Sequence, residues 1–289
     1  MLWESDLIAV EDSQNTQRNA HGGAEDGMMT TKQEHLTVRV TGVPISTLNM
    51  EQTCRLVSSW AADKEKTRCV TFANAHMLAV ASVDDSFFRA MNGMDLNCPD
   101  GRPLMWVGRY LEGHAELQNV PGPDFMSYFI ECTKGKGLRH FFLGARPGVA
   151  ESAVRNLRKL DPDIQVVGCY SPPYAPLSEE GLAKQAEITN ESGADIVWLS
   201  LGCPKQELWL HFNRHRLDRK VVLAVGQAID LAAGNMRRAP RVFRWLGLEW
   251  LYRLVQDPVR LSPRYFKYNS IFLWEVFKNH LLKEQPRTV

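Results

Sequence analysis

Short apolar runs alternate with longer amphipathic stretches along most of the chain. The runs are typical of strands buried on both faces, and they lie at 69–72, 96–98, 139–144, 164–168, 196–201 and 221–226. The stretches repeat apolar side chains every three or four residues, as helices do, at 50–60, 76–91, 102–111, 149–160, 179–192 and 207–216. This alternation predicts an α/β fold, a doubly wound, mostly parallel and Rossmann-like sheet with right-handed crossovers. One further strand is expected at 36–45, broken at Gly42 and Pro44.

The two ends of the chain differ from this central part. Residues 1–34 are polar and acidic, which predicts a disordered tail and confines the α/β domain to 35–235. Residues 236–289 predict a helical appendage in which one helix starts near 237 and ends at Pro258. Aromatic and basic side chains are mixed from Pro263 onward. That mixture suits a membrane interface or the surface of a second subunit in a homo-oligomer.

Charge and cysteine content narrow the class of protein. The 289 residues carry a formal net charge of +1, so nothing indicates binding of nucleic acid. Residues 235–289, however, hold eleven Lys or Arg against four Asp or Glu, which suits anionic phosphates or a membrane surface. The six cysteines form no Cys-x-x-Cys pair, which fits a reducing cytoplasm. No apolar run approaches the roughly 20 residues that span a bilayer, so we expect a soluble or peripheral protein.

The stretch 193–207 is the most informative part of the chain. A buried strand is expected to end at Gly202, and Pro204 then starts a helix. This places Lys205, Gln206 and Glu207 at the carboxyl end of a strand, where ligands bind in open α/β sheets. The alternative interpretation is an ordinary strand-to-helix turn with a solvated Lys and Glu.

Polar residues follow other predicted strands as well. Asp100 lies in a tight Pro-Asp-Gly turn. An Asp in such a turn is more often a turn residue or a helix cap than a catalytic group. A functional role is favoured only because a second polar loop, at 202–207, also follows a predicted strand. Gly144 and Gly148 precede a helix whose backbone N–H groups could receive a diphosphate. The third glycine of the dinucleotide fingerprint is missing.

Two other patterns are weaker. Asp161 and Asp163 match the Asp-x-Asp metal motif of many glycosyltransferases, but they precede a strand and are interpreted as a turn on the opposite edge of the sheet. His211 and His215 have helical spacing without the Glu of a zinc protease, so they are interpreted as surface residues. No metal site is therefore expected.

Seven motifs, taken in order, resemble those of a known family. They are Thr-Phe-Ala-Asn-Ala-His at 71–76, Pro-Asp-Gly at 99–101, Val-Pro-Gly-Pro-Asp at 120–124, Leu-Gly-Ala-Arg-Pro-Gly at 143–148, Leu-Gly-Cys-Pro-Lys-Gln-Glu at 201–207, Arg-Ala-Pro at 238–240 and Leu-Gly-Leu-Glu-Trp-Leu-Tyr-Arg-Leu at 246–254. The chain resembles the bacterial WecG/TagA/CpsF glycosyltransferases over roughly residues 36–264. Cys203 stands where the family more commonly has Ala.

The resemblance implies an inverting, UDP-sugar-dependent hexosyltransferase that needs neither metal nor cofactor. Its acceptor would be a polyprenyl-diphosphate-linked saccharide at the inner face of the plasma membrane, in the synthesis of exopolysaccharide or another cell-surface polysaccharide. The family's proposed base matches Asp100, and its substrate-binding residues match Gln206, Arg253 and Arg260. Positive charge from the two arginines and from the helix starts after Gly144 and Gly202 would receive the leaving diphosphate. The expected substrate-binding set is completed by Thr71, Asn74 and Asp230.

Two other classes of protein have features in common with this sequence. A Rossmann-type sugar-nucleotide-modifying enzyme would use the same sheet, but it should show the glycine fingerprint and usually a Tyr-x-x-x-Lys pair, and the sequence has neither. A non-catalytic scaffold of a polysaccharide assembly complex would explain the aromatic and basic segment. It would leave Asp100 and Gln206 without a purpose.

Overall fold

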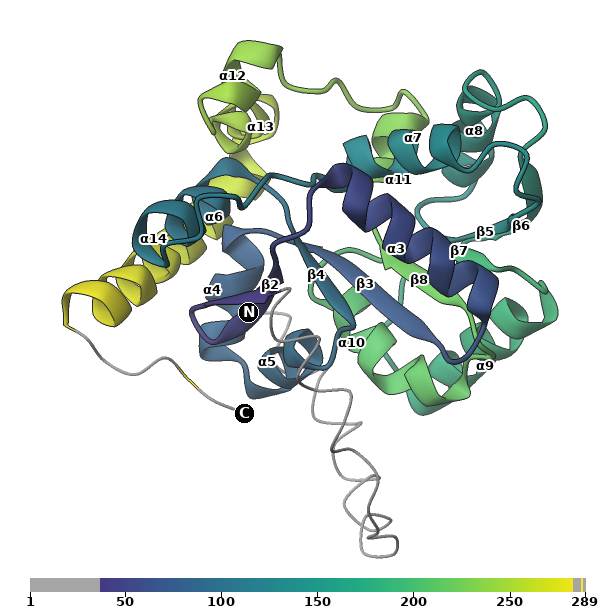
Figure 1. Cartoon of the computed structure of the whole chain (residues 1–289), viewed down its shortest axis with the longest axis horizontal. Coiled ribbons are helices and arrows are strands. Elements are labelled where there is room, and N and C mark those ends of the chain that lie inside the picture. The colour runs from purple at the N-terminus through teal and green to yellow at the C-terminus, as the bar shows by residue number, and fades with distance from the viewer. Residues whose placement is uncertain (1–36, 283–286, 288–289) are drawn as a thin grey trace, which may run out of the picture.

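A computed structural model describes residues 37–282 and residue 287, so the predicted tail at 1–34 lies outside the described residues. Six parallel strands form the central sheet in the order β4-β3-β8-β7-β5-β6. The strands are β3 (Arg68–Ala73), β4 (Leu96–Pro99), β5 (Arg139–Gly144), β6 (Gln165–Tyr170), β7 (Ile196–Ser200) and β8 (Val221–Ala224). The predicted α/β class and the parallel, Rossmann-like sheet are confirmed (Figure 1).

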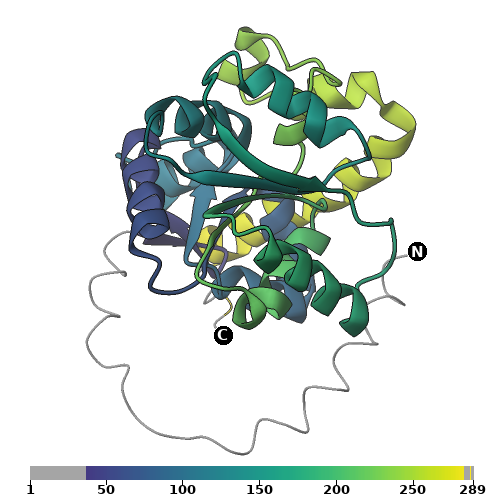
Figure 2. The same ribbon diagram turned by 90° about the vertical axis from the view of Figure 1, so that its right-hand side faces the viewer.

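Helices cover both faces of the sheet (Figure 2). One face packs against α4 (Ala75–Val83), α5 (Asp85–Asn92), α9 (Glu179–Glu191) and α10 (Lys205–Asn213). The other face packs against α3 (Met50–Asp63), α7 (Gly122–Cys132), α8 (Val149–Leu157) and α11 (Ala228–Ala232). The short elements α6 (Arg102–Trp106), η1 (Val107–Leu111) and η2 (Arg214–Arg216) connect them. Five of the strands are therefore buried between two apolar layers, which explains their largely apolar sequences, whereas β6 at the edge of the sheet is partly exposed.

The structure corrects two of the predicted elements and adds a third that was not predicted. The single strand expected at 36–45 is an antiparallel hairpin of β1 (Thr37–Val40) and β2 (Val43–Ser46), because Thr41 and Gly42 take the positive φ values of a tight turn. The helix expected at 76–91 divides into α4 and α5 at Asp84, whose extended backbone ends one helix while its carboxylate caps the next. Helix α7 was not predicted, since its start lies in the Pro- and Gly-rich segment 120–124.

The carboxyl-terminal part consists of three helices: two lie where a single helix was expected before Pro258, and the third begins at Pro258. They are α12 (Arg241–Trp245), α13 (Glu249–Gln256) and α14 (Pro258–Leu281). Gly247, with φ +70°, separates the first two and packs so closely that an added Cβ would lie 3.0 Å from the ring of Trp106. Pro258 begins α14, and this helix packs along α4 with Phe272 buried in the core (Figure 1).

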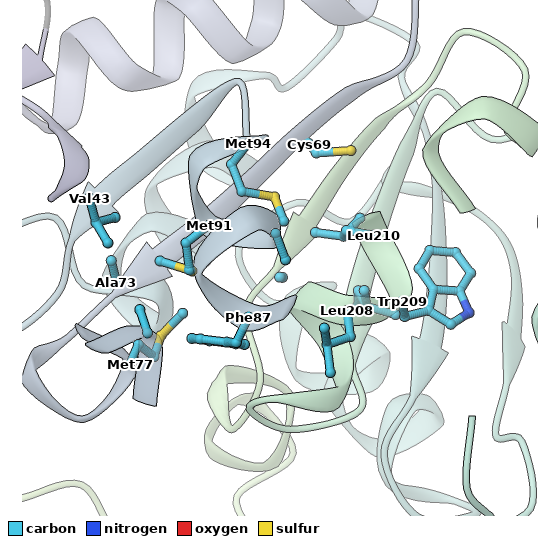
Figure 3. Close-up of a cluster of buried hydrophobic side chains, with 14 of the residues drawn as sticks. Val43, Cys69, Ala73, Met77, Phe87, Met91, Met94, Leu208, Trp209 and Leu210 are labelled. Carbon is cyan, nitrogen blue, oxygen red and sulfur yellow. The ribbon is translucent and has the colours of Figure 1, made fainter. Parts of the chain in front are cut away.

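Apolar contacts between helices hold α10 in place. Figure 3 shows Phe87 of α5 between Met77 of α4 and Leu208 of α10, within one continuous cluster. Phe87 and Trp209 are completely buried, and burial of a side chain of this size contributes about 1.5–3 kcal/mol. The cluster therefore fixes the first turn of α10, which carries Gln206.

Asp195 is one of the carboxylates that hold the amino edge of the sheet. Asp195 accepts hydrogen bonds from the backbone N–H of Arg139 at 2.9 Å and from its guanidinium at 3.1 and 3.2 Å, and it pairs with Lys64 at 2.7 Å. Burial raises the pKa of Asp195, but the hydrogen bonds from Arg139 and Lys64 outweigh burial and lower it to about 2. At the same edge Asp161 accepts from the N–H of Asp163 at 3.2 Å, which confirms the predicted turn.

Candidate active site

A large cleft lies at the carboxyl edge of the sheet, where β3, β4, β7 and β8 end. Its volume is about 1750 Å³, and helices α12, α13 and α14 form the wall opposite the strands. Ligand pockets of folded proteins are commonly about 300–1,000 Å³, so this cleft has room for two substrates. Four of the predicted site residues line it: Asn74, Asp100, Gln206 and Arg253. The sequence therefore placed residues from three strand ends and from the appendage at one cleft.

Other predicted site residues are elsewhere. Thr71 is completely buried within β3, and Gly144 closes β5 onto β7, since an added Cβ would lie 2.2 Å from the carbonyl oxygen of Ser200. Asp230 lies in α11 and forms a 3.9 Å ion pair with Arg146. As far as the described chain defines the cleft, these three do not line it, and their substrate-binding roles stay predictions. The side chain of Arg260 lies outside the described residues.

Asp100 is held in a tight turn at the end of β4. Its N–H donates to the carbonyl of Ala73 at 2.7 Å, which extends the pairing with β3, and Gly101 follows with φ +102°. Burial raises the pKa of the Asp100 carboxyl and the charge of Glu249 raises it further. Arg253, the N–H of Gly122 at the start of α7, and Arg238 lower it, and the pKa comes to about 7. The carboxyl group can therefore gain and lose a proton near neutral pH, as a general base must.

Two arginines from the carboxyl-terminal part flank this carboxyl group. Arg253 of α13 donates to Gln227 Oε1 and, at 3.0 Å, to Glu249 Oε1. Arg238 holds Asp124 with both terminal nitrogens, one of them at 2.6 Å, while its buried Nε has no hydrogen-bond partner among the described residues. The predicted site residues did not include Arg238. Its partner on α7 is 114 residues away, so only the Arg-Ala-Pro motif could have drawn attention to it.

Asn74 and His76 connect the cleft wall to the core. Asn74 Oδ1 accepts from the N–H of Met77 at 3.2 Å and caps α4, a contact worth about 1 kcal/mol. His76 Nε2 accepts from Arg264 Nε at 3.0 Å. Burial and the charge of Arg264 lower the pKa of His76 to about 3, so the ring is neutral and carries its proton on Nδ1. With its lone pair on Nε2 already engaged, His76 has no free nitrogen to act as a base.

Gln206 and Glu207 form a buried polar network at the start of α10. Gln206 Nε2 donates to Glu207 Oε1 at 2.7 Å and to the carbonyl of Ala224 at 3.3 Å, and the Thr71 hydroxyl donates to the same Glu207 oxygen at 3.3 Å. Glu207 is completely buried, so the alternative of a solvated Glu is wrong. Burial raises the pKa of Glu207 to about 7, although hydrogen bonds from Gln206 and Thr71 lower it in part. Lys205, by contrast, lies over the exposed ring of Tyr174 at 4.4 Å.

The three carboxyl-terminal helices, with the residues that directly follow α12 and α14, expose most of the large apolar side chains found on the described surface. These side chains are Val242, Trp245, Leu246, Trp250, Val255, Val259, Phe266, Leu273, Trp274, Phe277 and Leu282. Within the described residues, no helix is both long enough and apolar enough to cross a membrane. The same part of the chain contains no group of three or more His, Cys, Asp or Glu side chains that could hold a metal ion.

The chain is similar in sequence to known glycosyltransferases. A family model described as "Glycosyl transferase WecG/TagA/CpsF family" matches residues 38–286. The chain is 29% identical over 198 residues to the N-acetylglucosaminyldiphosphoundecaprenol N-acetyl-beta-D-mannosaminyltransferase of Bacillus spizizenii, covering 68% of this chain and 75% of that protein. The protein of the same name from Staphylococcus aureus strain MRSA252 is 26% identical over 256 residues, covering 86% of this chain and 96% of the relative.

Proposed function

The chain belongs to the WecG/TagA/CpsF family of glycosyltransferases, and from this premise we propose that it transfers a sugar, with inversion, from a uridine diphosphate donor to a polyprenyl-diphosphate-linked saccharide. The names of its relatives support the acceptor, because they specify an N-acetylglucosaminyl-diphosphoundecaprenol. The product of such a reaction is a polyprenyl-diphosphate-linked saccharide that is one sugar longer, an intermediate in the synthesis of cell-surface polysaccharide. A non-catalytic scaffold does not explain a carboxyl group whose pKa lies near neutrality beside arginines, and a Rossmann-type sugar-nucleotide-modifying enzyme should have the glycine fingerprint that this sequence lacks.

The observation that carries the proposal is the environment of Asp100. In the proposed step an acceptor hydroxyl gives its proton to the Asp100 carboxylate while its oxygen bonds to the anomeric carbon. The bond between that carbon and the diphosphate oxygen breaks on the opposite side, and uridine diphosphate leaves with the electron pair. A positioned base contributes about 10²–10⁴-fold to such a rate, and a pKa of about 7 suits that role.

Positive charge must meet the leaving diphosphate. Arg253 and Arg238 both line the cleft, and both lie close enough to lower the pKa of Asp100. A guanidinium binds two phosphate oxygens at once, so either arginine could exchange its present carboxylate or amide partner for the diphosphate. Arg260 remains a predicted member of this group. The absence of a metal requirement is also a prediction, and it needs the chelation test below.

The exposed apolar side chains of α12 to α14 support a peripheral position on a membrane. Trp245, Trp250 and Trp274 are 66%, 38% and 54% exposed, and indole rings are favoured at the boundary between headgroups and acyl chains. Basic residues of the same helices would face anionic lipid. The acceptor would then reach the cleft from the inner leaflet. Sedimentation with vesicles containing anionic lipid should carry the protein down, and replacement of Trp245 and Trp274 by Ser should reduce this binding.

The experiment that tests the function is transfer from a panel of uridine diphosphate sugars to a lipid-diphosphate-sugar acceptor in detergent. We expect turnover with at least one donor, a loss of about 10²–10⁴-fold in Asp100→Asn, and no loss on chelation of divalent metals. Asp161→Asn, on the opposite edge of the sheet, is the matched control and should retain full activity. Full activity in Asp100→Asn would remove this residue from catalysis, and loss on chelation would show that a metal takes part.

A further inference from the structure

We propose that Glu207 is a positioning residue that fixes the side-chain amide of Gln206. The amide oxygen of Gln206 is then the atom that accepts a hydrogen bond from the uridine diphosphate sugar. The substrate group bound there is then a hydroxyl or an N–H and never a phosphoryl oxygen. This inference rests on the proposed function, because it assigns the chemistry of one contact within the same cleft. It gives a role to a side chain that does not itself line the cleft.

The orientation of the Gln206 amide follows from its two partners. The end of the side chain that faces Ala224 lies 3.3 Å from a backbone carbonyl oxygen, which can only accept a hydrogen bond. The same end lies 2.7 Å from Glu207 Oε1, which already accepts from the Thr71 hydroxyl. An amide turned by 180° would place its oxygen against both of these oxygens. The NH₂ group must therefore face inward, and the amide oxygen must face away from Glu207.

The amide oxygen is the atom left for a ligand. Gln206 lines the cleft, is 5% exposed, and its Oε1 is buried with no hydrogen-bond partner among the described residues. Gly226, which also lines the cleft, lies next to it, and a Cβ added there would be 3.3 Å from Oε1. Because residue 226 is a glycine, it places no side chain against the oxygen on this side of the cleft. A buried acceptor without a partner is unfavourable, so a ligand that donates to it gains affinity.

Glu207 does not contact the substrate itself and acts through Gln206. Its side chain lies behind Gln206 with no exposed surface, and its Oε1 is tied to β3 through Thr71. Gln206 and Glu207 both belong to the first turn of α10, and α10 is fixed by the apolar cluster that includes α5 and β7. Thr71 thereby gains a positioning role although it does not line the cleft. Removal of the Glu207 oxygen would leave the Gln206 amide anchored only through the longer contact with Ala224, and the amide could then turn.

The test compares binding of intact donor with binding of analogues in which one hydroxyl at a time is replaced by fluorine, which cannot donate. Calorimetry on the full-length protein measures Kd for the donor that the transfer panel identifies, so slow chemistry of fluorinated sugars does not interfere. In the wild type we expect one replacement to raise Kd at least tenfold, and in Gln206→Met that difference should disappear. Glu207→Gln keeps the accepting oxygen and should discriminate like the wild type. Glu207→Met has similar volume without the oxygen and should lose most of the discrimination.

A second variant keeps the proposal open to refutation if Glu207→Met does not fold. Gln206→Glu places an oxygen where the NH₂ group faces Ala224 and Glu207, so it should bind the donor more weakly than Gln206→Met does. Equal discrimination in wild type and Glu207→Met, or donor binding by Gln206→Glu as tight as in the wild type, would overturn the inference while the transferase function stood. Failure of the wild type to bind any uridine diphosphate sugar would instead overturn the proposed function.

Discussion

Replacement of Asp100 by Asn is expected to stabilise the folded protein while it removes activity. Burial and the charge of Glu249 raise the pKa of this carboxyl group from 3.8 to about 7, so the folded state disfavours the charged form. At pH 8 the wild type carries that penalty in full. The difference of about 3 between the folded and unfolded pKa of Asp100 corresponds to a destabilisation of at most roughly 4 kcal/mol. Partial solvent access reduces this destabilisation to about 2–4 kcal/mol. Asn has nearly the same shape, carries no charge, and can still accept from the N–H of Gly122.

The pH dependence separates this explanation from a general effect of the substitution. For a carboxyl group with a raised folded-state pKa, the stability deficit begins as pH rises past the unfolded pKa near 4 and is complete above about 7. The advantage of Asp100→Asn in free energy of unfolding should therefore fall by more than half between pH 8 and pH 5. For a domain of this size, 1 kcal/mol corresponds to about 2–4 °C in Tm. Urea unfolding or calorimetry measures it, and a variant no more stable than the wild type at pH 8, or equally stabilised at both pH values, would refute the reasoning.

Three further outcomes follow from the same electrostatics. The kcat/KM of the wild type should rise with pH through about 7, as Asp100 ionises. Glu249→Gln should move that rise to lower pH, because one charge that raises the pKa of Asp100 is gone. An unmoved profile would mean that another group titrates. Asp195→Asn should lower the free energy of unfolding by about 2 kcal/mol at pH 7, and this loss should shrink below about pH 4, where Asp195 of the unfolded chain is protonated. Urea titrations at pH 3 and pH 7 measure the loss. An equal loss at both pH values would contradict the assigned cause. Arg264→Gln should raise the pKa of His76 from about 3, but not to its ordinary value, because burial is the larger cause of the lowered pKa and remains in the variant. NMR titration of His76 measures this pKa, and an unchanged titration would exclude the contact between Arg264 and the ring.

Periodicity along the sequence was sufficient for the fold class, because five of the six strands of the sheet are buried on both faces and have largely apolar sequences. It failed where local geometry depends on a few backbone angles. The turn at Thr41 and Gly42 made a hairpin from an expected single strand, and the extended backbone of Asp84 divided an expected helix. Helix α7 went unpredicted because Pro121 and Pro123 at its start indicate a turn, although the apolar spacing of Phe125 and Phe129 is helical.

The candidate site was predictable to the extent that it follows strand ends. Asn74 and Asp100 come directly after a buried run, and Gln206 lies in the first turn of the helix that follows another, so sequence position alone placed them on one edge of the sheet. Arg253 came only from resemblance to a family. The pair of Arg238 with Asp124 joins residues 114 positions apart, and the burial of Glu207 depends on packing between α10 and β3. Contacts of this kind are tertiary, and no local pattern indicates them.

The packing of α14 on α4 also bears on the order in which the protein is made. Helix α4 follows the first strand of the central sheet, whereas α14 is the last helix of the described chain. A ribosome therefore completes the sheet and its polar strand ends well before the segment that supplies Arg264 and Phe272 has emerged. Until then the apolar side of α4 that Phe272 covers has no neighbour, and one wall of the cleft is missing. A nascent chain stalled before residue 258 should bind chaperones through this uncovered side, so the cleft is complete only after α14 has been made.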